Sequence, residues 1–352
     1  GISGIAVAAG PLIGGAVVQG FSWHWIFWIN VPIGIALTPI AMRRLQESRG
    51  PYGTLDLPGL VLACSGAFGV VFALVRAQSL GWGSPTILAT LLGGAALLAG
   101  FVAWERRAPE PMLPMEFFAK RSFAVTNIAS LSMYFGMFGS IFFLSQFMQN
   151  VLHNTPFQAG LKLLVWTGAT MLVAPFAGVF SERYGSRPFI VAGLTLQALA
   201  LGLLAEMSAI DLSYGQMIVP FLMAGSGMAL VFAPSASAVL SSVRPDQAGQ
   251  ASGATNAIRE LGGVLGVAVL ASVFTGSGSY DSPQAFVDGL TPALWTSVAV
   301  LGAGALTVLL LPFTTRAASA SATEPLRADG ECAEHVPINS APTVALATRE
   351  PV

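Results

Sequence analysis

The sequence predicts an all-α polytopic membrane protein. About ten apolar stretches, most of them long enough to cross a bilayer, fill the chain from residue 1 to about residue 311. Hydrophobic residues make up 54% of the chain and charged residues 9%, and the mean hydropathy is +0.71. Because soluble domains carry about 25% charged residues, this composition suits hydrocarbon rather than water.

The apolar stretches define the expected membrane spans. A span of about 17–28 residues, at a rise of about 1.5 Å per residue, fits a hydrocarbon core of roughly 30 Å. The expected spans are 2–20, 25–42, 57–76, 86–104, 123–148, 157–180, 189–207, 214–240, 249–274 and 290–311. Helix breakers such as Gly50-Pro51 and Asn154-Thr155-Pro156 lie between them.

The distribution of lysine and arginine predicts the orientation. If the first span runs from inside to outside, all of the 16 basic residues except Arg76 and Lys162 fall on or near the inner side. Inner loops carry the excess of positive charge, so we expect a multi-pass protein of the cell membrane with a cytoplasmic C-terminus. Residues 313–352 are rich in Ala, Thr, Pro and Glu, which predicts a disordered cytoplasmic tail.

The sequence offers no enzymatic chemistry. Its two cysteines and three histidines are scattered, so neither a disulfide framework nor a metal site is indicated. We find no phosphate-binding loop and no nucleophile motif, and we expect no cofactor. The basic residues sit in short connectors, which excludes a nucleic-acid-binding face.

A glycine-proline motif lies in the first span. Its residues are Gly10, Pro11, Gly14 and Gly15. Proline bends a helix, and the Gly10/Gly14 spacing lets another helix come very close. The motif suits either a helix that rocks against a partner or a tight, static crossing.

A short charged connector follows the sixth span. The residues of interest are Gly178, Glu182, Arg183, Gly185 and Arg187. Gly185 permits a left-handed turn, and Glu182 can accept hydrogen bonds from an arginine or a helix N-terminus. We expect a cytoplasmic latch between two helix ends, and the alternative is a plain positive anchor.

An arginine lies within the ninth span. By helical spacing Ser252, Asn256, Arg259, Gly263 and Gly266 share one face. An arginine at mid-membrane costs roughly 2.5–3.5 kcal/mol, so Arg259 should face a polar cavity or a paired acid. The alternative is that its side chain snorkels to the inner interface.

Aromatic and amide side chains in the span 123–148 extend this candidate cavity. They include Asn127, Tyr134 and Gln146, and Glu260 follows Arg259. Aromatics with a few amides can line a pocket for a flat lipophilic molecule. The phenylalanines of this span could equally pack in the core or face lipid.

These motifs together resemble the major facilitator superfamily, specifically the fourteen-span drug:proton antiporters of the EmrB/QacA type. Residues 10–15 resemble that group's antiporter motif in its fifth helix, and residues 25–34 its signature entering the sixth. Residues 182–187 resemble the second copy of the inner-loop motif, and residues 259–266 the eleventh core helix.

The resemblance implies a major facilitator fold with about ten of fourteen helices present, four of them missing before Gly1. Residues 1–44 would be the last two helices of the N-terminal bundle, 45–122 two extra helices with cytoplasmic connectors, and 123–312 the C-terminal six-helix bundle.

It also implies proton-coupled export of a lipophilic or cationic small molecule by alternating access. The rivals are a nutrient importer on the same architecture and a transport-dead truncated membrane protein.

Overall fold

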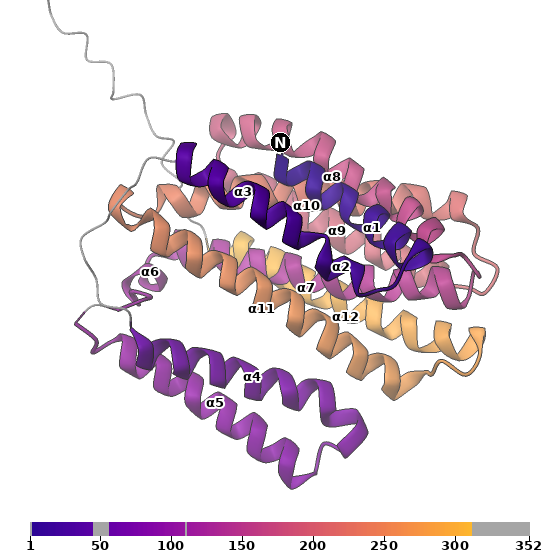
Figure 1. Cartoon of the computed structure of the whole chain (residues 1–352), viewed down its shortest axis with the longest axis horizontal. Coiled ribbons are helices and arrows are strands. Elements are labelled where there is room, and N and C mark those ends of the chain that lie inside the picture. Colours follow the sequence, from indigo (N-terminus) through magenta and orange to yellow (C-terminus); the bar gives the residue numbers. More distant parts are fainter. Residues whose placement is uncertain (1, 45–55, 110, 312–352) are drawn as a thin grey trace, which may run out of the picture. The chain divides into compact units, whose positions relative to one another are not determined.

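The computed structural model describes residues 2–44, 56–109 and 111–311, and every regular element in these ranges is helical (Figure 1). The elements are α1 (Ile2–Gly20), α2 (Trp25–Trp28), α3 (Asn30–Arg44), α4 (Leu57–Leu80), α5 (Pro85–Glu105), α6 (Glu116–Ala119), α7 (Arg121–Asn150), α8 (Pro156–Tyr184), α9 (Ser186–Met207), α10 (Tyr214–Ser241), the 3-10 turn η1 (Pro245–Gln247), α11 (Ala248–Ser277) and α12 (Pro283–Leu310). The expected tail at 313–352 and the Gly50-Pro51 breaker lie outside the described residues.

The membrane-protein class predicted from the sequence is confirmed. Within the described ranges, nine helical segments are long and apolar enough to cross a membrane, with α2 and α3 together forming the segment Trp25–Arg44. Each corresponds to one of the expected spans. The remaining expected span, 2–20, is the 19-residue helix α1.

Local capping explains where several helices start and stop. The Asp56 carboxylate accepts a 2.9 Å hydrogen bond from the Gly59 amide at the start of α4. Thr155 begins α8 with a reciprocal capping box, and the Ser282 hydroxyl accepts from the first turn of α12. Gly185 adopts φ +87°, which favours glycine and makes the connection between α8 and α9 a single residue.

Helices α7 to α12 share one hydrophobic core. Its largest fully buried side chains include Trp166, Phe147, Phe221 and Phe286. Helix α10 packs against α8 and α9, α12 against α9 and α7, and α11 against α7. These six helices correspond to the residues that the sequence analysis assigned to a C-terminal bundle.

Glycines of α11 allow its close packing on α7. A Cβ atom at Gly262 would lie 2.6 Å from the Leu131 carbonyl oxygen, and one at Gly266 would lie 2.8 Å from the Phe135 Cα. Both contacts pair residues 131 positions apart, so the two helices run side by side in a constant register. Residues 127 and 258 therefore lie at about the same depth.

The remaining helices pack outside this core. Helix α1 contacts α8, whereas α2 and α3 bury none of their side chains. Helices α4 and α5 form a hairpin in which a Cβ atom at Gly94 would meet the Val70 amide at 2.7 Å. The Trp104 indole donates a 2.9 Å hydrogen bond to Asp56 and ties the ends of this hairpin together, and α4 also contacts α11.

Candidate functional site

The glycine-proline motif of α1 lies against the first turns of α8. A Cβ atom at Gly15 would lie 2.5 Å from the Pro156 carbonyl oxygen and 3.0 Å from the Phe157 Cα. In return, a Cβ atom at Gly160 would collide with the Pro11 carbonyl. The Phe157 amide also donates a 3.3 Å hydrogen bond to the Gln19 side chain. The two backbones therefore touch directly, and each helix supplies a glycine at the contact.

Of the four motif residues, Pro11 and Gly15 make this contact, whereas Gly10 and Gly14 do not. Within the part of the chain that the structure describes, nothing lies within 4 Å of a Cβ atom placed at Gly10 or Gly14. One residue step rotates a side chain by about 100° around a helix, so Gly15 faces α8 while its neighbour Gly14 does not. The close approach predicted for Gly10 and Gly14 is thus provided by Gly15 and Gly160.

The first turn of α9, directly after the Gly185 connection, reaches a third helix. The Arg187 guanidinium donates hydrogen bonds from Nε to the Val308 carbonyl at 3.2 Å and from Nη2 to the Leu309 carbonyl at 2.6 Å. The final carbonyls of a helix lack partners within that helix and carry partial negative charge. Arg187 therefore caps the C-terminal end of α12, a partner that the sequence analysis did not identify.

The other residues of the expected latch are less engaged. Glu182 and Arg183 are exposed at the end of α8, and the Arg183 guanidinium lies 5.6 Å from the Tyr184 ring centroid. Among the described residues Glu182 has no ion pair, and a Cβ atom at Gly178 would touch only Ala233, at 3.9 Å. The link thus joins Arg187 to α12, and the release of a latch stays a prediction.

Arg259 lies deep in the helical bundle. It sits close to residue 261, the midpoint of the apolar segment Pro245–Ser277, and only 9% of its surface is exposed. Its guanidinium carbon lies 5.1 Å from the ring centroid of Phe232 in α10 and 5.9 Å from that of Tyr134 in α7. The cation is therefore held among three helices, against two aromatic rings.

The hydrogen-bonding capacity of Arg259 is unused on one side. Its Nε and Nη2 atoms are buried and have no hydrogen-bond partner among the described residues. Cation–π contacts contribute about 2 kcal/mol or more when desolvated, but they do not satisfy N–H donors. Buried N–H groups without acceptors are costly, so these two donors carry a free-energy penalty unless an acceptor outside the described residues pairs with them.

Of the other predicted cavity residues, one is buried near the depth of Arg259 and others are exposed. Asn127 is 2% exposed, donates a 2.9 Å hydrogen bond to the Phe123 carbonyl and leaves its own side-chain oxygen without a partner in the described chain. It lies near the depth of Arg259 by the register of α7 and α11. Asn256 and Glu260 are exposed.

Gln146 lies at the other end of α7. Its side chain hydrogen-bonds Tyr280 in the connector before α12. Desolvation raises the pKa of the Tyr280 phenol, and the hydrogen bond with Gln146 lowers it in part. The structure therefore brings Tyr134 to Arg259 and separates Gln146 from them.

One contributor to the arginine site was missed from the sequence. Phe232 forms one wall of the arginine site, but it lies in an apolar run of α10 that carries no polar signal. Lys162 of α8 donates a 2.7 Å hydrogen bond to Asn154 and lies 5.0 Å from the Tyr214 ring centroid. The sequence marked Lys162 only as a charge on the outer side.

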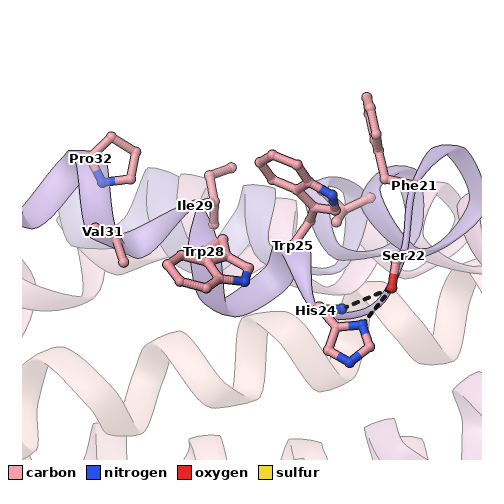
Figure 2. A pocket seen from close by; sticks show the side chains of 9 residues that line it. Phe21, Ser22, His24, Trp25, Trp28, Ile29, Val31 and Pro32 are labelled. Carbon is pink, nitrogen blue, oxygen red and sulfur yellow. Dashed lines mark hydrogen bonds between the residues drawn. The ribbon is translucent and has the colours of Figure 1, made fainter.

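An apolar pocket of about 860 Å³ lies along α1, α2 and α3 (Figure 2). Trp25 and Trp28 belong to its lining and remain 54% and 61% exposed. Two of its polar side chains pair with each other, because the Ser22 hydroxyl lies 2.6 Å from His24 Nδ1. This surface fits the tryptophan-rich interfacial belt expected at span ends.

Comparison with known proteins agrees with this architecture. The family profile of the Major Facilitator Superfamily matches residues 1–267 and 126–346. The tetracenomycin C resistance and export protein of Streptomyces glaucescens is 32% identical over 272 residues, which are 77% of this chain and 50% of that protein.

Two further relatives have similar names. The puromycin resistance protein pur8 of Streptomyces alboniger is 31% identical over 88% of this chain and 63% of its own length. The cephamycin export protein CmcT of Amycolatopsis lactamdurans is 34% identical over 78% of this chain and 58% of its own length.

The chain thus spans about half the length of several curated relatives. The family match covers nearly all of the sequence and coincides with the helical bundle described above. On this evidence, the chain belongs to the major facilitator superfamily of membrane transporters.

Proposed function

We propose that this chain is part of a secondary active exporter of lipophilic or cationic small molecules, including antibiotics, which moves them in exchange for protons. The names of the relatives support export. The observation that carries the mechanism is the close backbone contact between α1 and α8 at Gly15 and Gly160.

This contact suits alternating access, in which two helical bundles rock around a central site. In the proposed orientation α1 runs outward and α8 runs inward, so Gly15 and the first turn of α8 lie toward the outer side. Direct backbone contact there closes the outer side, because no side chain holds the helices apart. Glycine has no side chain to interlock with the opposite helix. The two helices can therefore move apart without disrupting packed side chains.

The proposed transporter has fourteen spans, of which this chain supplies ten. Residues 1–44 belong to the N-terminal bundle, 45–122 form two extra helices, and 123–312 form the C-terminal bundle of a fourteen-span transporter. The relatives, about twice as long as the matched region, leave room for four further helices, which would hold the proton-coupling acid. The protein lies in the cell membrane with its C-terminus in the cytoplasm.

Everted membrane vesicles that contain the full-length protein test antiport directly. Lipophilic cations, dyes and antibiotics should dissipate an imposed pH gradient when the protein is present and not in vesicles without it. No response across a broad panel would overturn proton-coupled export. Substrate accumulation in intact cells would instead indicate an importer, and movement of no compound in either direction would indicate a transport-dead protein.

Orientation is tested by single-cysteine accessibility. A cysteine at Glu182 should react only with reagents that enter the cytoplasm. Labelling from the outside by an impermeant maleimide would invert the proposed topology.

A further inference from the structure

The unsatisfied edge of Arg259 carries a specific geometry. A guanidinium presents its Nε–H and Nη2–H side by side, in one plane and pointing the same way, which matches the two oxygens of a carboxylate. These two nitrogens are the ones that the structure leaves buried without a partner in the described residues. The unused edge is therefore the one suited to bidentate binding.

The surroundings restrict what can approach that edge. Phe232 and Tyr134 lie at 5.1 and 5.9 Å from the guanidinium carbon. Neither aromatic residue accepts a hydrogen bond from Nε or Nη2 in the described chain. A planar anion would match the two parallel donors, and an aromatic body attached to it would find rings to stack on.

The charges of the described chain do not supply this anion. Glu260 follows Arg259 in sequence, but it is exposed and forms no ion pair with it. In that part of the chain the ion pair found joins Arg244 to Asp246, at 3.0 Å. A carboxylate for Arg259 must come from a bound molecule or from a segment outside the described residues.

We propose that Arg259 is a carboxylate-binding subsite for the transported molecule, with Tyr134 and Phe232 as the aromatic walls. This inference rests on the proposed export function and names one class among its substrates: lipophilic molecules that carry a carboxylate, zwitterions included. An ammonium group alone would be repelled at this point of the site. The Arg259 guanidinium selects for a negatively charged, planar group on the ligand. The two aromatic walls select for a flat ligand body.

A pair of isosteric probes tests the subsite. The full-length protein in nanodiscs is titrated with 1-naphthoate and with neutral 1-naphthamide, without any ion gradient, and binding is followed by tryptophan fluorescence. The wild type should bind the carboxylate about tenfold or more tightly than the amide, since the loss of a charge-assisted bidentate pair is that costly.

Substitutions test whether Arg259 causes the preference for the carboxylate probe over the amide probe. Arg259→Gln should bind both probes equally, with the amide affinity within about twofold of the wild type. Arg259→Lys keeps a cation for folding but lacks the side-by-side donors, so it should lose most of the preference. Arg244→Gln removes an exposed cation near the start of α11 and should keep the full preference.

The opposite results would overturn the subsite. A preference that survives in Arg259→Gln, or the absence of any preference in the wild type, contradicts it. If the wild type shows no preference and Arg259→Gln also lowers the unfolding temperature of the ligand-free protein, the carboxylate belongs to the protein itself. Because binding is measured without transport, a wild type that binds naphthoate but moves nothing would contradict export alone.

Discussion

Arg187 donates a 2.6 Å hydrogen bond to the carbonyl of Leu309, so the first turn of α9 is fixed to the last turn of α12. The bond joins residues 122 positions apart in the sequence. It links three helix ends on one side of the bundle, at the place where the sequence predicted only a local latch.

The first prediction concerns this link. Arg187→Gln removes two hydrogen bonds to unpaired helix carbonyls and should lower the free energy of unfolding by about 1 kcal/mol, because the half-exposed site is partly screened by water. Thermal unfolding of the purified protein measures the change. Arg183→Gln is the matched control, since Arg183 is exposed and should shift stability by less than about 0.5 kcal/mol. Equal losses in the two variants would contradict the cap.

The second prediction concerns the contact between α1 and α8. Gly160→Ala places a Cβ atom into the Pro11 carbonyl, so the helices must separate and transport should fall at least about tenfold. Gly168→Ala lies in the same helix with nothing described within 4 Å, and it should transport normally. Vesicle transport at matched protein levels gives the comparison, and normal transport by Gly160→Ala would refute the closed contact.

The third prediction concerns Gly185. Its φ of +87° belongs to a region that side chains with a Cβ atom rarely adopt, and Gly185→Ala should cost about 1–3 kcal/mol. Gly178→Ala, inside α8 with only an ordinary 3.9 Å contact, should be neutral or slightly stabilising. Unfolding temperatures of the two variants separate backbone strain from a general effect of added bulk.

The fourth prediction concerns Gln197 of α9, which is fully buried. Neither polar atom of its side chain has a hydrogen-bond partner in the described part of the protein. Gln197→Met keeps much of the volume and removes the unsatisfied amide, so stability should rise by about 1–3 kcal/mol. Gln149→Met, which removes a local bond to Ser145, should not be stabilising. A destabilised Gln197→Met would show that the amide has a partner in the intact protein.

The sequence predicted the helices well because hydropathy reports which segments need hydrocarbon. It was less accurate at helix ends, where backbone chemistry decides. The apolar run ended at residue 180, yet α8 continues through Glu182 and Arg183 until Gly185 turns the chain. Likewise α12 begins at Pro283, seven residues before the expected span, because the Ser282 cap sets its start.

The candidate site was predictable only in part. Helical spacing and membrane cost singled out Arg259, and the structure places it in the bundle beside Tyr134. Its second wall, Phe232, depends on how α10 and α11 are rotated against each other, which no local pattern encodes. The same limit applies to Arg187, whose acceptors come from a helix that is distant in the sequence.

The α4–α5 hairpin is held together mainly by contacts between its own two helices. Its two helices meet through glycines, Asp56 and Trp104 join their ends, and α4 touches the six-helix core along α11. A helix pair that is held together by its own contacts depends little on the helices beside it. Deleting both helices together should therefore leave the packing of the six-helix core unchanged.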